Sequence, residues 1–277
     1  MKRVWIILNR ASRAVGDDWE AKLVAAFEAR GACVAGTTDF PHQDLPMPHE
    51  LEEADIDVVA VAAGDGTINA AARALEDWSG TLLVLPGGTM NLLAKALHGD
   101  ALPDAIVAAV TSPPAARALP TVECGEYRAL VGIIMGPAAR WVHAREAVRH
   151  GRWHRVIRAV RLASLRTLSQ AVRVREGTRR SKGYRAIFAH PDGDALAIIR
   201  VRAAGWADGV RLGFTYVTGT WERARGIETS SVAEVTLAGE RPVFALFDGE
   251  PVYLPPDATL RAGKTRLKFV TTKGSTA

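Results

Sequence analysis

Two short, continuously apolar stretches in this sequence each end in a glycine-rich turn, and they strongly limit the possible folds. Residues 58–63 (Val-Val-Ala-Val-Ala-Ala) run into 64–67 (Gly-Asp-Gly-Thr), and residues 81–85 run into 86–89 (Pro-Gly-Gly-Thr). Apolar residues at helical spacing follow both turns. Because a strand without a polar face must be covered on both sides, these stretches predict a parallel sheet buried between helices.

The same alternation of short apolar runs and helical periodicity fills the first 115 residues. Asp17 or Asp18 is expected to cap a helix that Gly31 ends, and a later helix is expected at 90–97. Further strands are predicted at 4–8 and 33–37, and further helices after Pro48 and Pro103.

Around Pro113-Pro114 the pattern changes to short strands separated by turns, beginning with an expected hairpin of 118–123 and 128–134. We therefore predict a doubly wound α/β domain over 1–116 and an antiparallel β-sandwich-like domain over 117–277. A basic helical segment at about 137–171 is inserted in the second domain. A return of the last residues to the first domain is left open.

Composition narrows the class of protein further. The 277 residues are 48% hydrophobic and 23% charged, as in a globular domain, and no run approaches the roughly 18 apolar residues of a membrane-spanning helix. The two cysteines, Cys33 and Cys124, have no metal-binding spacing. This predicts a reduced, cytoplasmic environment.

The two glycine-rich turns can bind phosphate. Gly64 and Gly66 let backbone N–H groups approach an anion at the start of a helix, and Thr67 adds a hydroxyl. Asp65 is unexpected in an anion site unless Mg²⁺ or a hydroxyl donor accompanies the phosphate. The alternative is an ordinary tight strand-to-helix turn, but parallel strands place both turns at one edge of the sheet, where ligands bind.

Four motifs carry a family resemblance. Residues 64–67 with Asn69 resemble the GGDGTxNE motif of the diacylglycerol kinase catalytic-domain family, which includes bacterial lipid kinases and sphingosine kinases. Residues 86–91 (Pro-Gly-Gly-Thr-Met-Asn) are similar to its P-x-GT-x-N motif, 9–12 (Asn-Arg-Ala-Ser) stand in place of NPxSG, and 248–250 (Asp-Gly-Glu) match its DGE signature. All four occur in family order over nearly the whole chain. NAD kinases share GDGT but lack the late DGE.

The resemblance implies that ATP binds the first domain, a lipid binds the second, and Mg²⁺ assists phosphoryl transfer. Asp208 is similar to a family aspartate of a magnesium-linked network, although Asp208-Gly209 is equally compatible with a plain hairpin turn. The residues implied in nucleotide binding are Asn9, Ser12, Thr38, Gly64, Asp65, Gly66, Thr67, Asn69, Gly88 and Thr89.

The catalytic carboxylates implied by the resemblance are Glu250, Asp248 and Asp65. Glu250 is expected to be the base that takes the proton of the lipid hydroxyl, with Asp248 as the alternative. Taken alone, 248–250 would be a solvated acidic turn between two strands.

The chain departs from the family pattern at four positions. Ala63 replaces the first glycine of GGDGT, Ala70 replaces the glutamate, and Arg10 and Arg13 replace residues of NPxSG. Because of these departures, two alternatives for the function stay open. The chain is a weakly active or catalytically inactive relative that binds nucleotide and lipid, or it acts on an unusual substrate.

The charge of the chain is concentrated in one segment. Residues 140–185 hold fourteen Lys and Arg against two Glu, whereas the whole chain has a net charge of +5. Within 141–168 apolar residues recur at helical spacing among arginines, as in helices that lie on anionic membranes. The alternative is a helix packed on its own domain with a solvated arginine face.

These observations predict a phosphotransferase with an alcohol acceptor, an ATP- and Mg²⁺-dependent kinase of a diacylglycerol-like or sphingoid-like lipid. An NAD-kinase-like enzyme is the alternative within the same fold. We expect a cytoplasmic protein with peripheral contact at the inner membrane. A homodimer is allowed. No zinc-finger spacing or helix-turn-helix pattern supports nucleic-acid binding. The acceptor lipid itself is not encoded in any recognisable motif.

Overall fold

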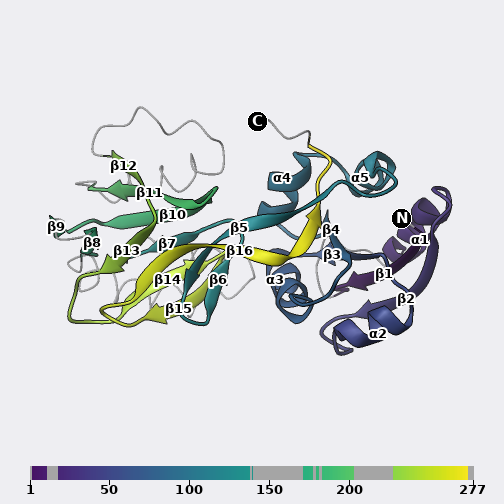
Figure 1. The fold of residues 1–277 in the computed structure, drawn as a ribbon, viewed down its shortest axis with the longest axis horizontal. Helices are drawn as coiled ribbons and strands as arrows, with labels where there is room; N and C mark the ends of the chain where they lie inside the picture. Colours follow the sequence, from purple (N-terminus) through teal and green to yellow (C-terminus); the bar gives the residue numbers. More distant parts are fainter. Residues whose placement is uncertain are drawn as a thin grey trace, which may run out of the picture. The chain divides into compact units, whose positions relative to one another are not determined.

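The computed structural model describes residues 2–10, 18–137, 139, 171–176, 179–180, 183–202 and 227–273. The chain divides into two compact units, and two of its strands run from one unit into the other (Figure 1). The first unit consists of residues 1–119 and 264–277, and the second of residues 120–263.

The first unit is built on a parallel sheet with the strand order β2-β1-β3-β4-β16. The order reverses between β1 and β3, and ligands of such sheets bind at the carboxyl ends of the strands at this point. The strands are β1 (Arg3–Leu8), β2 (Cys33–Asp39), β3 (Val58–Ala63), β4 (Thr81–Pro86) and the end of β16 (Thr259–Val270).

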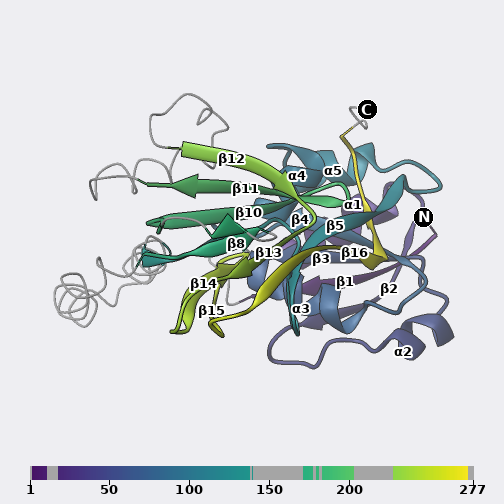
Figure 2. The same ribbon diagram turned by 60° about the vertical axis from the view of Figure 1, so that its left-hand side comes forward.

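Helices cover both faces of this sheet, because its central strands have no polar side: all six residues of β3 are buried. Figures 1 and 2 show helices on both sides of the strands. On one face, Leu23 and Phe27 of α1 and Ile106 of α5 pack against β1, β3 and β4. The predicted doubly wound α/β fold is therefore confirmed. The helices are α1 (Trp19–Glu28), α2 (Pro48–Glu53), α3 (Asp65–Ala74), α4 (Leu92–His98) and α5 (Pro103–Ala109).

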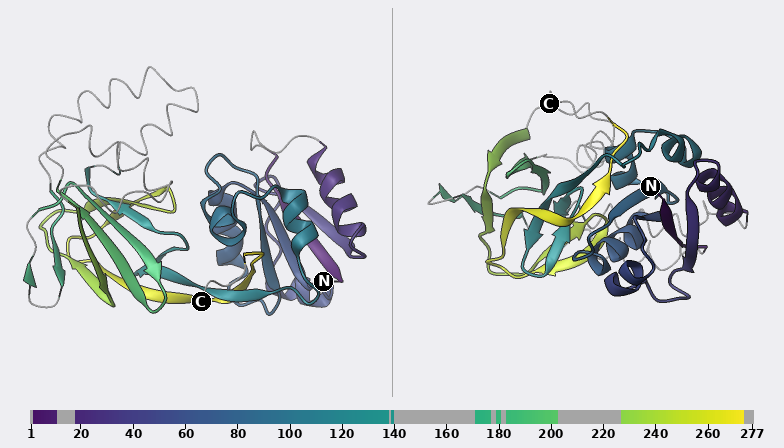
Figure 3. Two further views of the ribbon diagram at one scale, coloured as in Figure 1. Left: turned by 90° about the horizontal axis from the view of Figure 1, so that it is seen from above. Right: turned by 45° about the vertical axis from the view of Figure 1, so that its right-hand side comes forward.

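The second unit is an antiparallel sandwich (Figure 3). One of its sheets has the order β12-β11-β10-β7-β14-β15. Its strands are β12 (Ile227–Val232), β11 (Ala195–Val201), β10 (Ala186–Asp192), β7 (Ile133–Met135), β14 (Val243–Phe247) and β15 (Glu250–Leu254). The facing layer contains β5 (Ala116–Cys124), β6 (Tyr127–Ala129), β8 (Val174–Glu176), β9 (Arg179–Arg180), β13 (Glu234–Leu237) and the beginning of β16.

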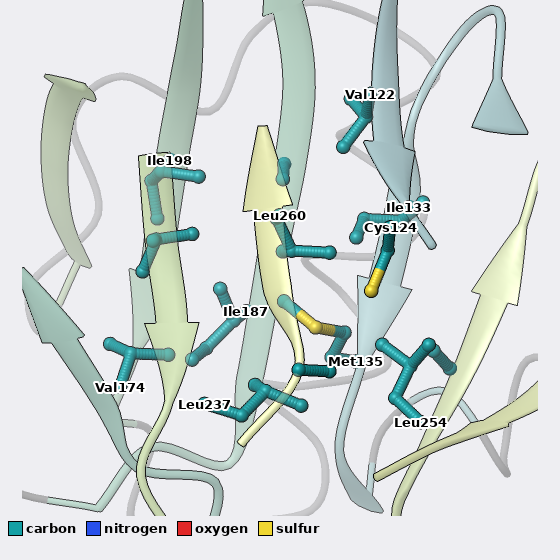
Figure 4. Packing of buried hydrophobic residues seen from close by; sticks show 14 of the residues in the cluster. Val122, Cys124, Ile133, Met135, Val174, Ile187, Ile198, Leu237, Leu254 and Leu260 are labelled. Carbon is teal, nitrogen blue, oxygen red and sulfur yellow. The ribbon is translucent and has the colours of Figure 1, made fainter. Parts of the chain in front are cut away.

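A single apolar cluster lies between these two layers. Met135, Ile187 and Ile198 from the six-stranded sheet pack with Val122 and Leu260 from the facing layer (Figure 4). Only one side of each strand enters this cluster. On the other side of the six-stranded sheet, Phe188 and Ile199 belong to a second, smaller apolar cluster. The antiparallel sandwich expected for the second domain is therefore confirmed.

Three local predictions need correction. The expected strand 128–134 is two strands, β6 and β7, because the backbone of 130–132 turns towards Asp248. The helix expected at 90–97 begins at Leu92, since Asn91 adopts a left-handed conformation with φ of 52°. Asp18 precedes α1 without capping it; its carboxylate instead pairs with Lys22 at 2.6 Å.

In the described part of the chain, none of the helices combines the length and the apolar character that crossing a bilayer would require. The basic segment expected at about 137–171 lies almost entirely outside the described residues.

Candidate functional site

The candidate nucleotide site lies where β1, β3 and β4 end. The register pairs Leu8 with Ala62 and Ala62 with Leu85, so the three strands finish at nearly the same level. The segments that follow them, beginning at Asn9, Gly64 and Gly87, therefore share one edge of the sheet. This is the edge at which the strand order reverses.

A side-chain hydrogen bond crosses the reversal point. Asn9 Nδ2, after β1, donates to Thr67 Oγ1, in the first turn of α3, over 2.9 Å. Thr67 is buried, with 7% of its surface exposed. The bond ties together two of the motifs that the sequence singled out, and it fixes the hydroxyl of Thr67 at the start of a helix.

The two glycine-rich turns touch through their backbones. A Cβ atom on Gly88 would lie 2.5 Å from the Cα of Gly64, and one on Gly87 would lie 2.7 Å from the backbone nitrogen of Ala63. Glycine is therefore required in the second turn for packing against the first. Gly64 precedes α3 without a side-chain cap, so its helix start keeps N–H groups suited to an anion.

Asp65 and Asn91 hold the second turn in place. Asp65 Oδ1 accepts a hydrogen bond from the N–H of Leu92, the first residue of α4, over 2.9 Å. The N–H of Gly88 donates to Asn91 Oδ1 over 2.7 Å, and Asn91 Nδ2 donates to the carbonyl of Gly88 over 3.0 Å. Asp65 thus links the turn after β3 to the helix after β4. Asn91 is a site residue absent from the expected set, although its place in the second motif could have indicated it.

The remaining expected nucleotide residues differ in their surroundings. Thr38, near the end of β2, is 5% exposed, and its hydroxyl accepts a hydrogen bond from Trp5 Nε1 over 2.9 Å. Gly66 and Thr89 are exposed, and Asn69 is partly buried. Ser12 lies outside the described residues.

The carboxylate of Asp248, in the second unit, accepts hydrogen bonds from three backbone N–H groups. Its Oδ2 accepts the N–H of Leu130 over 2.7 Å, and its Oδ1 accepts those of Val131 and Gly132, each over 2.9 Å. The residue is 7% exposed and has a φ of 47°. This carboxylate therefore joins the β14–β15 turn to the segment between β6 and β7.

Glu250 stands two residues later in a different environment. It is the first residue of β15, directly opposite Phe247 of β14, and it is exposed. Gly249 between the two acids has a φ of 97°, a conformation that favours glycine. The DGE motif is thus a tight turn with one buried and one exposed carboxylate.

A metal site is not formed by clustered side chains in the part of the chain that the structure describes: no group of three His, Cys, Asp or Glu there could hold an ion. Asp208, the expected magnesium-linked residue, lies outside the described residues.

The first unit is also similar to a known domain family. The family model described as "Diacylglycerol kinase catalytic domain" matches residues 3–118, and this match confirms the resemblance. A comparison with curated proteins finds no match.

Three solved structures from Bacillus anthracis str. Sterne share the fold of the whole chain. One is named "a diacylglycerol kinases" and two carry the name "putative diacylglycerol kinase". The first two have a TM-score of 0.65 at 15% identity, and the third has 0.63 at 16%. Each match covers 98% of this chain and 97% of the other. The likeness extends the shared fold beyond residue 118, into the second unit.

Proposed function

We propose that the protein is an ATP-dependent lipid kinase that transfers the γ-phosphate of ATP to the hydroxyl of a diacylglycerol-like or sphingoid-like lipid. The observation that carries the proposal is the coupling of the two glycine-rich turns at the reversal point of a family-matched sheet. Gly64, Thr67 and Gly88 are held there by contacts that involve Asn9 and Asp65. The exposed Glu250 in a DGE turn supports the other part of the proposal, in which a base takes the proton of the lipid hydroxyl.

The residues of the first unit fit a nucleoside triphosphate. The start of α3 offers backbone N–H donors and the positive end of a ten-residue helix, and both favour phosphate oxygens. Ala63, which replaces a family glycine, is fully buried as the last residue of β3. This departure therefore falls in the strand and removes no glycine from the turn.

The same turn is compatible with Mg²⁺ that arrives with the nucleotide. Mg²⁺ in phosphoryl-transfer sites uses one or two carboxylates, and phosphate oxygens and waters complete its shell, so a cluster of three acids is not required. Asp65 is the carboxylate of the turn, and Asp208 would be the second. When bound, the ion would neutralise charge on the phosphates.

Glu250 is the residue we assign as the base. Its side chain is exposed. In the proposed step it takes the proton of the acceptor hydroxyl as the oxygen attacks the γ-phosphorus of ATP, the bond to the β-phosphate oxygen breaks and ADP leaves. Asp248 is suited to another task, because both of its oxygens already accept backbone N–H groups. We infer that Asp248 positions the turn that carries Glu250.

Peripheral contact with an anionic membrane is part of the proposal, because a lipid kinase must reach a substrate held in a bilayer. The excess of Lys and Arg over residues 140–185 supports it. Each basic side chain near such a surface contributes about 1 kcal/mol of attraction.

The test is a transfer assay with γ-labelled ATP and a panel of lipids in mixed micelles, with and without Mg²⁺. The panel should contain a diacylglycerol, a monoacylglycerol, a sphingoid base and a prenol, and a separate arm should contain NAD. We expect label in at least one lipid, dependence on Mg²⁺, and a loss of about 10²-fold or more in Glu250→Gln.

Glu53→Gln is the matched control, since Glu53 is an exposed glutamate at the end of α2. It should keep wild-type turnover. Label in NADP and in no lipid would replace the proposal with an NAD-kinase-like activity, and nucleotide binding without any transfer would indicate an inactive relative.

A further inference from the structure

Three charged side chains meet beside the ends of β1 and β2, and the proposed reaction uses none of them. Arg10, which follows Asn9, donates from Nη2 to Glu20 Oε2 of α1. Its Nε lies 3.7 Å from Asp39 Oδ2, and its backbone N–H donates to Asp39 Oδ1 over 3.3 Å. Arg10 stands where the family resemblance has proline, so this link between β1, α1 and β2 is a feature of this chain.

The cluster holds Asp39 in a defined orientation. Asp39 ends β2 and pairs in register with Leu8, and its own N–H donates to Gln43 Oε1 over 2.8 Å. About a quarter of its side chain (26%) is exposed. Because each carboxylate oxygen can accept two hydrogen bonds, Asp39 can still accept hydroxyl groups alongside its contacts with Arg10.

The position of Asp39 suits the sugar of a nucleotide. β1 separates β2 from β3, so the ends of β2 and β3 lie two strand spacings apart, about 10 Å. A nucleotide whose phosphates contact the turn at Gly64 could span this distance with its ribose. In other α/β nucleotide sites an acidic residue near the same edge accepts the ribose hydroxyls.

We propose that Asp39 and Arg10 form a ribose-selecting pair for the nucleotide. Asp39 accepts hydrogen bonds from the ribose hydroxyls. Arg10 positions this carboxylate and offsets its repulsion of the phosphates, while Glu20 holds the guanidinium from the side of α1. The inference rests on the proposed function, since it needs the phosphates at the glycine-rich turns.

The experiment measures binding, without turnover, on the full chain. Isothermal titration with Mg²⁺ compares ATP with 2′-deoxy-ATP for the wild type, Asp39→Asn, Asp39→Ala and the control Asp44→Asn. Asp44 is an exposed aspartate in the segment after β2. A hydrogen bond to a charged acceptor corresponds to about a tenfold or larger change in Kd. We expect the wild type and Asp44→Asn to prefer ATP by at least about tenfold, and both Asp39 variants to fall within about threefold.

Arg10 is tested as a positioning residue by the same ratio of dissociation constants. Arg10→Met should lower the preference for ATP, and Arg10→Lys should restore most of it, which a role in stability alone would not produce. Equal affinity of the wild type for both nucleotides, or an unchanged preference in both Asp39 variants, would overturn the proposal. Absence of any adenine nucleotide binding by the wild type would contradict the proposed function as well, so the two failures can be told apart.

Discussion

The two acids of the DGE turn lie in different surroundings, and the pair Asp248→Asn and Glu250→Gln tests the different roles that we propose for them. Both substitutions replace a carboxylate by an amide of the same shape. Asp248 accepts three backbone N–H groups at 2.7–2.9 Å in a buried position, whereas Glu250 is exposed. We expect Asp248→Asn to reduce stability strongly and Glu250→Gln to reduce activity strongly.

The magnitude follows from the hydrogen bonds of Asp248. Asparagine keeps one acceptor oxygen, which can serve Val131 and Gly132, but it places an NH₂ group opposite the N–H of Leu130. One buried donor is left unpaired and the other two bonds lose their charge. A loss of about 2–4 kcal/mol in the free energy of unfolding follows, whereas an exposed substitution such as Glu250→Gln stays within about 0.5 kcal/mol.

Thermal unfolding followed by circular dichroism, together with the lipid transfer assay, provides the readout. We expect the Tm of Asp248→Asn to fall by roughly 5–15 °C, at about 2–4 °C per kcal/mol for a chain of this size. Below that Tm its turnover should keep the wild-type pH profile, because Glu250 is intact. A wild-type Tm for Asp248→Asn, or a Tm loss in Glu250→Gln with unchanged turnover, would refute the separation of roles.

Three further predictions concern other parts of the chain. Gly88→Ala should lower stability by about 1–3 kcal/mol and weaken ATP binding at least tenfold, since its Cβ would lie 2.5 Å from the Cα of Gly64; wild-type binding and Tm would contradict the packing of the two turns. His98 is 6% exposed and burial lowers its pKa from 6.5 to about 4, so the folded state disfavours its charged form. The free energy of unfolding should therefore decrease by up to about 3 kcal/mol as the pH is lowered from about 6.5 to 4. In urea titrations, His98→Gln should flatten this part of the pH profile. An equal slope in both proteins would exclude His98 as the source of the pH dependence. Replacing Arg149, Arg152 and Arg155 by Ala should weaken sedimentation with anionic vesicles at least tenfold, and unchanged binding would assign these charges to a solvated face.

Most of the first unit could be predicted from the sequence because its central strands, β3 and β4, are predominantly apolar. The run 58–63 has no polar face, so it could only be a central strand, and the glycines after it and after 81–86 marked both turns. Three of the four motifs fall within residues 3–118, the segment that the family model matches.

The parts that the sequence did not reveal depend on contacts between distant residues. The strand expected at 128–134 breaks because Asp248, more than a hundred residues later, binds the amides between its halves. No periodicity encodes such a bond. In the same way, the glycine at 88 suggested a phosphate contact, whereas the structure adds close packing against Gly64 as a second reason for it.

Arg10 shows how a departure from a family motif can be informative. Its position in place of proline was visible in the sequence, but its partners were not. Glu20 and Asp39 lie 10 and 29 residues away along the chain, and only the end of β1 beside β2 brings them together. The sequence could therefore mark the residue but not its contacts.

Identification of the phosphorylated product is the most direct test of the proposed lipid kinase activity. The protein is incubated with ATP carrying an oxygen isotope in its γ-phosphate and with the lipid panel, and the lipid fraction is examined by mass spectrometry. A lipid phosphate monoester with the isotope, formed by the wild type and absent with Glu250→Gln, is the predicted result. Isotope recovered only in inorganic phosphate or in NADP, with every lipid unchanged, would contradict the assignment as a lipid kinase.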